Sequence, residues 1–493
     1  MRFVSVCRGI LLASLLGVPV HAQTSSPPAE QPTPGASQGA QVSPAPPTTP
    51  QGNTTQSTND EIRMARTTED IRERMLLDRI DQLEKRLAEL EARSNASAAP
   101  PTASAVIQTP ASAPTPATSA AASPAQNAVP VATPEAAPPT WSIGPIDFSG
   151  LVDGYYGFNA NHPASMTNQL YNFDTKANQF SLNMVKLSMS HTADPVGFQV
   201  DFGFGRAFDI IHASEPNDAP GILRNVEQAY VSLKPAALKG FEIDLGQFVT
   251  SAGAEVIETN SNWNYSRSLL FSWAIPYYHF GIRTSFPIGK HFTGGVQLVN
   301  GWNDTEDNNS GKTVGLTDSI TYTKFAWSNT YYGGPENPGT NTGWRHLYDT
   351  VLLLTPNSKV NAYLNFDYGQ NTSPLAVDTG TGTSAATTTD PTFTAKWYGI
   401  AGALHFQANS KWSFTPRLEW FKDRDGFSTG TAQDVKEFTL TGEYKVIQGF
   451  LARAEYRYDW SNQPFFDRGI NPAAMKDQNV LALGFVGFFG PKR

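Results

Sequence analysis

The fold of this chain is decided by residues 450–460, which read FLARAEYRYDW. Apolar or aromatic side chains stand at every second position from Phe450 to Trp460, and charged side chains stand between them from Arg453 to Asp459. Because successive side chains of a β-strand point to opposite faces, this alternation predicts a strand with one apolar and one charged face.

The same period of two recurs along the chain after Trp141. Residues 198–204, 360–368 and 437–446 each place apolar side chains on one face and polar side chains on the other. A membrane-spanning helix would need a run of roughly 20 apolar residues, and the sequence contains none. The region from Ile146 to Phe489 is therefore predicted to be all β.

A soluble β-sandwich also alternates apolar and polar residues along its strands, but two features distinguish a membrane barrel from it. Aromatic side chains such as Trp412, Trp420 and Tyr458 lie near the predicted strand ends, as in the aromatic girdles of outer-membrane barrels. The connections also alternate between short turns and long loops. We therefore expect a transmembrane antiparallel β-barrel of about sixteen strands. The predicted turns are 194–197, 287–290, 323–325, 356–359, 409–411 and 447–449, and the predicted loops are 159–178, 207–224, 250–276, 333–343, 370–390 and 461–478.

The first 140 residues differ from the barrel region in composition. Arg2 and Arg8 flank the start of a short apolar run that ends in the small-residue pattern before Gln23, which predicts a signal peptide over residues 1–22. Residues 23–59 and 94–140, a Pro/Ala-rich tether rich also in Ser and Thr, are predicted to be disordered. The barrel is assigned to residues 141–493. We expect an outer membrane of Gram-negative type, with the N-terminal segment in the periplasm.

Residues 60–93, between the two tethers, are dense in Glu, Arg and Leu. Five apolar residues follow the a/d spacing of a short coiled-coil helix, which favours self-association, with a homotrimer as the expected assembly. A lone amphipathic helix is the alternative, because two heptads are few. The five residues are Leu76, Ile80, Leu83, Leu87 and Leu90.

The barrel region resembles the OmpL-like β-barrel porin family over residues 148–489. The resemblance rests on LVDGYY at residues 151–156, QFSLN at 179–183, EQAYV at 227–231, and NWNYSRS at 262–268 running on to PYYHFG at 276–281. It implies a pore-forming barrel of the outer membrane. The closing strand ends on Phe488 and Phe489 but is followed by four more residues, whereas the usual assembly signal ends on the aromatic residue.

Two common enzyme motifs are absent from the sequence, which has no H-E-x-x-H and no P-loop. The net charge of -8 argues against a nucleic-acid partner, which would need a basic face. The only cysteine, Cys7, lies in the predicted signal peptide, so the mature chain has no disulfide or thiolate metal site. We expect no enzyme, no cofactor and no metal.

Charged residues on the predicted strands are expected to face the lumen, because a charge facing lipid at mid-membrane costs roughly 2–4 kcal/mol. Charges of both signs occur, which argues against strong ion selectivity. The lumen of sixteen strands is expected to hold water, and an interior ladder of salt bridges is the alternative. The candidate pore-lining residues on strands are Arg283, Arg417, Glu419, Arg453, Glu455, Arg457 and Asp459.

The connection 250–276 differs from the other loops in composition, since it carries Ile257, Trp263, Leu270 and Phe271 among other apolar residues. Such a surface is not expected to remain in solvent, so the loop is predicted to fold inward and narrow the pore. Arg267 is expected to face the acidic lumen residues, with Glu255 and Glu258 as counter-charges within the loop. An outer flap packed on its neighbours is the alternative.

The predicted function is that of a porin, a passive diffusion channel through which small hydrophilic solutes or ions cross a water-filled barrel. A structural anchor, in which the barrel holds the coiled coil to the envelope, and a barrel enzyme are the alternatives.

Overall fold

The structure is a computed structural model that describes residues 141–215, 221–374 and 392–490. The predicted signal peptide, both tethers and the coiled-coil segment 60–93 lie outside the described residues. No helix within the described ranges is long and apolar enough to cross a membrane.

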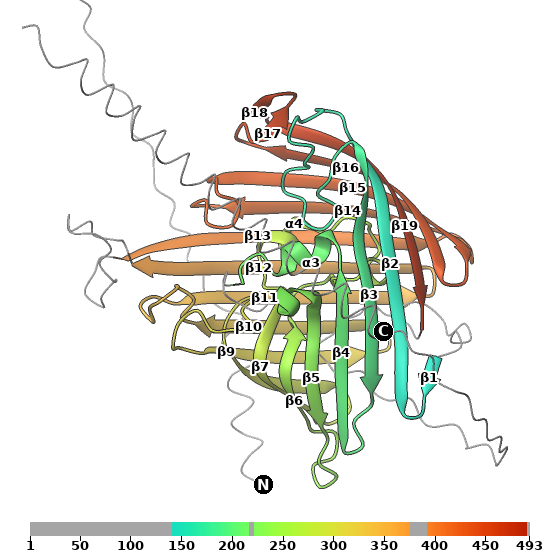
Figure 1. Ribbon diagram of the computed structural model, residues 1–493, viewed down its shortest axis with the longest axis vertical. Helices are drawn as coiled ribbons and strands as arrows, with labels where there is room; N and C mark the ends of the chain where they lie inside the picture. Colours follow the sequence, from blue (N-terminus) through green and yellow to red (C-terminus); the bar gives the residue numbers. More distant parts are fainter. Residues whose placement is uncertain (1–140, 216–220, 375–391, 491–493) are drawn as a thin grey trace, which may run out of the picture. The chain divides into compact units, whose positions relative to one another are not determined.

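Sixteen long strands of the described part form one antiparallel barrel (Figure 1). Each strand pairs with its neighbour in sequence, and the last strand returns to pair with the first, as Val480 with Asn159 and Leu483 with Tyr156. The barrel has no free edge as a result, which confirms the predicted fold. The strands are β2 (Ile146–Asn159), β3 (Gln179–His191), β4 (Val196–Phe204), β5 (Val226–Leu233), β6 (Glu242–Val249), β7 (Tyr278–Ile288), β8 (Phe292–Val299), β9 (Thr313–Tyr322), β10 (Phe325–Gly334), β11 (Arg345–Asn357), β12 (Val360–Pro374), β13 (Thr392–Gln407), β14 (Trp412–Asp423), β15 (Gln433–Ile447), β16 (Phe450–Ser461) and β19 (Asp477–Phe489).

The remaining elements are shorter and are not among the sixteen strands of the barrel wall. Strand β1 (Trp141–Ile143) pairs with the start of β2, and β17 (Phe466–Arg468) pairs with β18 (Asn471–Met475). The helices of the described part are short, one turn or little more, and all lie in loops. They are α3 (Arg206–Ile211), η1 (Gly221–Asn225), η2 (Thr259–Ser261) and α4 (Leu269–Trp273).

The two ends of the barrel differ in the length of their connections. At one end, the short-turn end, β9 and β10 are joined by residues 323–324 alone, as the sequence predicts, and β15 and β16 by residues 448–449. The connection 234–241 at this end was not singled out from the sequence. The opposite, long-loop end carries the connections 160–178, 205–225, 250–277, 300–312, 335–344, 424–432 and 462–476.

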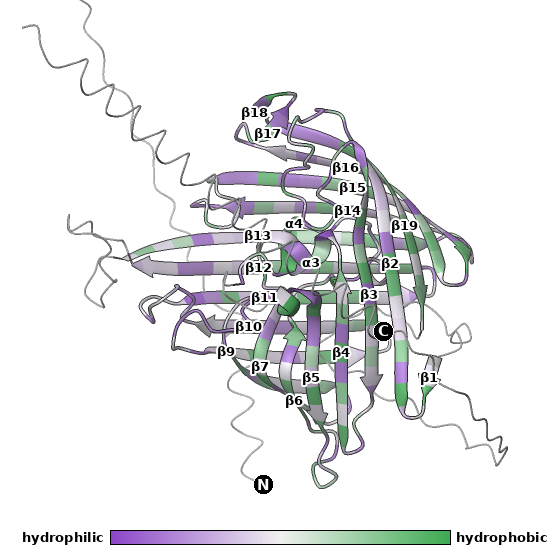
Figure 2. Cartoon of the chain, viewed as in Figure 1, coloured by the Kyte–Doolittle hydropathy of each residue, from purple (hydrophilic) through white to green (hydrophobic). Residues whose placement is uncertain are grey.

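Polar and apolar side chains alternate along the strands as the sequence predicts (Figure 2). On β14, the outward-facing Leu418 is 62% exposed, whereas its inward-facing neighbours Arg417 and Glu419 are buried. On β16, Arg453, Glu455 and Arg457 are buried on the inner face. The apolar outer face suits lipid, and the polar inner face gathers most of the charge of the barrel.

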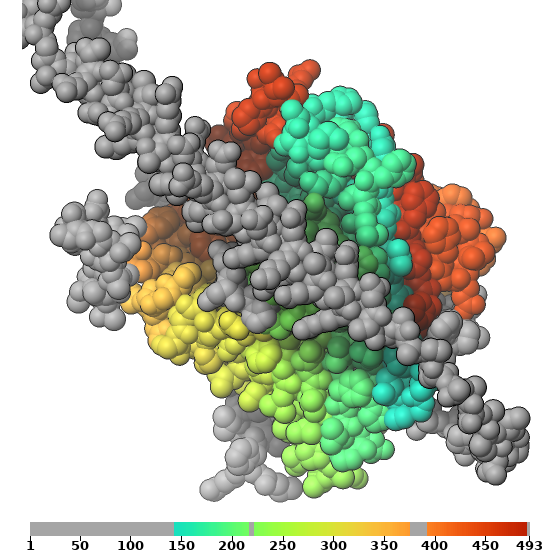
Figure 3. All heavy atoms as spheres, in the orientation of Figure 1, coloured from blue at the N-terminus to red at the C-terminus, as the bar shows by residue number. Residues whose placement is uncertain are grey.

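Two loops contact each other at the long-loop end, where the segment after β2 lies beside the hairpin β17–β18 (Figure 3). The backbone N–H of Ala164 donates to the carbonyl of Gly469, and the N–H of Gly469 donates to the carbonyl of Asn161. Ser165 adds a bond to the Asp467 carboxylate, 3.0 Å. This pairing holds the loop 160–178 above the barrel interior.

Candidate functional site: a loop packed inside the barrel

The segment between β6 and β7, residues 250–277, is called the inner loop here because it folds into the barrel. Its apolar residues Ile257, Leu269, Leu270 and Phe271 are buried and belong to the main hydrophobic cluster. The helix α4 is capped by Ser268, whose hydroxyl accepts from the N–H of Phe271 at 3.0 Å. The apolar content of this segment therefore packs inside the barrel, where the sequence predicts it.

Three wall arginines, Arg417, Arg453 and Arg457, hold the inner loop and are called the arginine cluster. Arg417 donates to the carbonyl of Ser266 at 2.8 Å, and Arg457 donates to the carbonyl of Arg267 at 2.7 Å. Arg453 donates to three loop carbonyls, those of Thr259, Asn262 and Asn264 at 2.7, 2.6 and 3.1 Å. A guanidinium suits this task because its five donors form a fixed fork.

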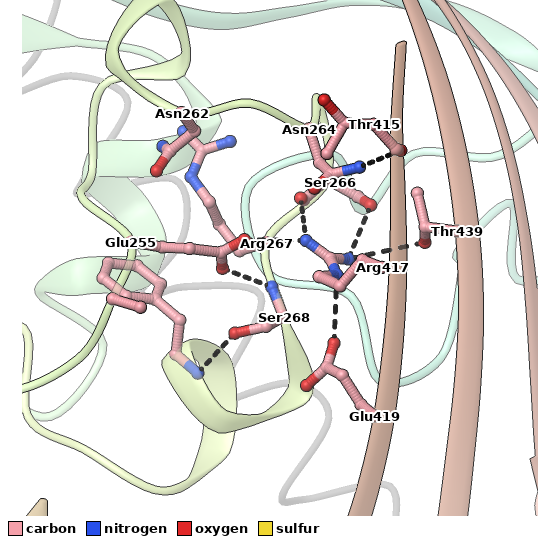
Figure 4. A network of polar contacts seen from close by, with 12 residues as sticks. Glu255, Asn262, Asn264, Ser266, Arg267, Ser268, Thr415, Arg417, Glu419 and Thr439 are labelled. Carbon is pink, nitrogen blue, oxygen red and sulfur yellow. Dashed lines mark hydrogen bonds and ion pairs between the residues drawn. The ribbon is translucent and has the colours of Figure 1, made fainter. Parts of the chain in front are cut away.

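Wall carboxylates bind the N–H groups of the same loop. Glu455 accepts from the backbone N–H groups of Tyr265 and Ser266 at 2.6 and 2.9 Å, and Glu419 accepts from that of Leu270 at 3.3 Å. Figure 4 shows Arg417 between Ser266 of the loop and Glu419 of the wall. The wall thus satisfies both the donors and the acceptors of an irregular backbone, which would otherwise be costly to bury.

The strands β2 and β3 hold the inner loop on another side. Asp153 on β2 accepts from the Tyr265 hydroxyl at 2.7 Å and also from the Thr259 hydroxyl. Lys186 on β3 forms a salt bridge with Glu258 at 2.5 Å. The loop therefore reaches from its own strands, β6 and β7, to walls built by the first strands and the last strands of the barrel.

A third side is held by β12 and β13. The N–H of Ala254 donates to Asn365 at 3.2 Å, and the Trp397 indole donates to the carbonyl of Ala274 at 3.0 Å. Where the inner loop lies, the barrel interior is packed with side chains. The inner loop therefore occupies part of the barrel cross-section at that level.

The placement of Arg267 differs from the expectation. Its guanidinium donates to carbonyls of its own loop, those of Val256 at 3.0 Å, Tyr265 at 2.6 Å and Ile257. It also stacks on the ring of Phe173, 5.0 Å from the centroid. Arg267 is buried, its hydrogen bonds join parts of the inner loop to each other, and it does not face the acidic wall residues. Alternation along a strand could not reveal this, because the contacts form within an irregular segment.

The other candidate residues fall into two groups. Glu255 joins the arginine cluster, since Arg417 lies 2.8 Å from its carboxylate, and Asp459 pairs with Arg457 at 2.8 Å. Arg283 lies apart from the cluster and pairs with Asp244 at 2.8 Å, with its guanidinium over the ring of Phe248.

The sequence analysis did not assign a site role to Lys186, which the structure places among three carboxylates. Its ammonium lies 3.1 Å from Asp201, 3.0 Å from Glu227 and 2.5 Å from Glu258. These three acids have the spacing of a metal site. The lysine ammonium occupies the position that a cation would take, so the group is a salt-bridge network. Only the three-dimensional proximity of β3, β4, β5 and the inner loop reveals it.

Acidic groups dominate the interior. Among the described residues, seventeen Asp and Glu residues are buried, against six Lys and Arg residues. Two acids in connections at the long-loop end have raised pKa values: burial, followed by the nearby Glu455, raises the pKa of Asp174 to about 7. Burial, followed by Glu336 and Glu215, raises the pKa of Asp304 to about 8. Burial is the main cause of both shifts, and neighbouring carboxylates add to it.

A closed sixteen-stranded barrel with an apolar outer face and a loop packed into a charged interior defines the class of outer-membrane β-barrel channels. The chain belongs to the family described as Putative beta-barrel porin-2, OmpL-like, whose model matches residues 145–489. The resemblance seen in the sequence is confirmed, and the protein is an outer-membrane porin. No curated protein matches the chain.

Several solved structures are similar to the chain. They include outer-membrane expressed OmpT of Vibrio cholerae, with 12% identity, 71% of this chain and 100% of that chain covered, and a TM-score of 0.45. The outer membrane channel DcaP of Acinetobacter baumannii has 12% identity, 70% and 97% coverage, and a TM-score of 0.45. The anion-selective porin from Comamonas acidovorans has 9% identity, 70% and 99% coverage, and a TM-score of 0.45. The family match, and not these similarities, carries the assignment.

Proposed function

We propose that this porin is a narrow, cation-preferring channel through which small hydrophilic solutes and ions diffuse passively, with the inner loop as its constriction. The single observation that carries the preference is how the interior charges are used. Every arginine of the cluster donates to the inner loop and is buried. The guanidinium groups of the cluster are therefore not accessible to a passing ion.

Negative charge remains accessible beside the same loop. The side chain of Glu258 on the loop is 21% exposed, and that of Glu443 on the wall is 23% exposed. Their basic partners, Lys186 and Arg453, are almost completely buried. An ion at the constriction therefore meets carboxylates first, and a charge at a narrow aperture acts through a focused field.

The test is the reversal potential of single channels in planar bilayers under a salt gradient. The wild type should conduct and prefer K⁺ to Cl⁻, and Glu258→Gln with Glu443→Gln should reduce the permeability ratio several-fold. Asp209→Asn is the matched control, because that side chain is 68% exposed on α3, pairs with Arg206 of the same helix and should leave the ratio unchanged. A wild type that prefers anions would contradict the cation preference, and a wild type that does not conduct would favour the structural anchor.

The remaining assignments extend this proposal. The short-turn end would face the periplasm, together with the tethers and the coiled-coil segment 60–93, because short turns lie on that side in bacterial barrels. Leu83 and Leu87 would then lie in a seam between chains, which crosslinking of the double Asp variant tests. The family match supports a channel over an enzyme.

A further inference from the structure

The outer face of β9, β10 and β11 carries a group of polar side chains that the channel function does not use. Asp318 on β9, Asn329 on β10 and Thr350 on β11 are direct cross-strand partners. Their neighbours on the same face of β9, Val314 and Leu316, are among the exposed large hydrophobic residues. These three polar side chains therefore point toward lipid and not into the barrel.

The group is joined by hydrogen bonds into one patch. The Asn329 amide donates to Asp318 at 3.0 Å, and its oxygen accepts from the hydroxyls of Tyr348 at 3.0 Å and Thr350 at 2.9 Å. The Trp327 indole donates to the Thr350 hydroxyl at 2.8 Å. These five residues, Asp318, Trp327, Asn329, Tyr348 and Thr350, are called the outer polar patch below.

The depth of the patch makes it unusual for a lipid-facing surface. The aromatic girdle at the short-turn end includes Tyr322 and Phe325, whose rings stack at 5.1 Å. Asp318 lies four residues before Tyr322 on β9. This separation is about 13 Å along the strand, or about 10 Å along the membrane normal for a tilted strand. Because the apolar band is about 25 Å tall, Asp318 lies near its middle.

Other walls of the barrel are apolar at the corresponding outer positions. On β12 these positions hold Ala362, Leu364 and Phe366, and on β19 they hold Leu481, Leu483 and Phe485. Lipid chains offer no hydrogen-bonding group, so a carboxylate and an amide at this depth are costly unless protein covers them. The patch therefore indicates that β9–β11 face protein.

The unused bonding capacity of the patch points to its partner. Among the described residues, one carboxylate oxygen of Asp318 accepts from Asn329, no cation contacts the carboxylate, and the Asn329 amide donates to Asp318 alone. One acceptor and one amide hydrogen thus remain available on the same surface. A two-fold arrangement lets the amide of each copy meet the carboxylate of the other, because an isologous contact joins a surface to itself.

We propose that the outer polar patch is a docking surface for a second copy of this chain, with Asp318 and Asn329 at the centre of the contact and exposed apolar residues such as Leu316 at its rim. This inference goes beyond the proposed channel function and does not depend on conduction or on the coiled-coil segment.

Crosslinking of the full mature chain in membranes tests the proposal, since that chain has no cysteine after removal of the predicted signal peptide. Leu316→Cys places a thiol beside the patch, and Leu483→Cys on β19 is the matched control, because the two side chains are 49% and 51% exposed. A short bis-maleimide should link Leu316→Cys chains into dimers and leave Leu483→Cys chains monomeric. The same pair should be tested with Leu83→Asp and Leu87→Asp present, so that the coiled-coil segment cannot bring chains together.

Adding Asp318→Leu and Asn329→Leu to Leu316→Cys should lower the dimer yield by about tenfold, as expected for the loss of interface hydrogen bonds in a membrane. Heat modifiability in SDS verifies that the variant barrel folds. Equal crosslinking of the two cysteine variants, or an undiminished dimer in the leucine background, would overturn the proposal. A crosslinked product whose mass does not fit two copies would overturn the choice of partner.

Discussion

Two walls of the barrel place their polar side chains on opposite faces. In β14–β16, the charged residues Arg417, Glu455 and Arg457 face inward and bind the inner loop. In β9–β11, Asp318 and Asn329 face outward and bind each other. The first group has a full set of partners within the chain, whereas the second leaves bonding capacity unused.

The difference shows where each wall finds its partner. A polar group inside the barrel can be satisfied by a loop of the same chain, because the loop is tethered and its effective concentration is high. A polar group on the outer face lies beyond the reach of those loops and needs another molecule. Because side chains alternate between the two faces of a strand, polar residues can serve two kinds of contact. Those of β14–β16 bind a loop inside the barrel, and those of β9–β11 lie on the outer surface.

The largest effect is expected from Arg417→Met, which breaks the internal contact. The change leaves Glu255, Glu419 and Glu437 buried without the cation that lies between them. Removing one partner of a buried ion pair costs about 3–5 kcal/mol, so the barrel should unfold at clearly lower denaturant and the inner loop should loosen. Unfolding in detergent and single-channel conductance measure the two consequences.

Arg417→Lys is the control for that variant, since it keeps the charge and removes the fork of donors. It should lose less stability than Arg417→Met. If Arg417→Met unfolds like the wild type and conducts with the same amplitude, the arginine cluster does not hold the loop.

A smaller, pH-dependent effect is expected from Asp174→Asn in the loop above the arginine cluster. Since burial raises the pKa of Asp174 to about 7 from an ordinary 3.8, the folded state binds the proton more tightly than the unfolded state. The free energy of unfolding therefore falls as pH rises from the ordinary pKa of 3.8 through the folded-state pKa of about 7. It should increase by about 1 kcal/mol from about pH 8 to about pH 6.

The asparagine variant should lack this part of the pH dependence and be more stable than the wild type at the higher pH. Chemical unfolding at both pH values measures the difference. Identical pH profiles for the two proteins would show that Asp174 ionises freely.

An effect of similar size is expected from Asp318→Leu measured on the isolated monomer in detergent. A lipid-facing carboxylate costs less than a basic residue at the same depth, so the substitution should stabilise the monomer by about 1 kcal/mol. Denaturant unfolding at low protein concentration measures it. A destabilised monomer would mean that Asp318 is satisfied within its own chain, and the contrast between the two walls would disappear.

The sequence alone predicts much of the barrel because the constraints are local. Alternation on β16 and the apolar content around Leu270 reflect whether a side chain contacts lipid, water or protein. The short turn at residues 323–324 reflects the end of the barrel at which it lies. The charged candidates on strands could be assigned to the inner face for the same reason, and Arg417, Glu455 and Arg457 are found there.

The partners of those charges could not be predicted, because they are set by which walls the inner loop reaches. Arg267 was expected to face wall acids and instead binds carbonyls of Val256 and Tyr265, an arrangement that depends on the path of an irregular backbone. Lys186 gathers acids from β4, β5 and the inner loop, which are neighbours only after the barrel closes.

The side of the wall on which each strand residue stands follows from alternation, because a β-strand turns successive side chains to opposite faces. Which side chains meet across the barrel depends on the folded chain, since these contacts join segments far apart in sequence, as Glu255 and Arg417 do. The outer polar patch shows the same difference between the face of a residue and its partners. Asp318 could be identified from its strand, but its pairing with Asn329 and Thr350 depends on the register of β9, β10 and β11.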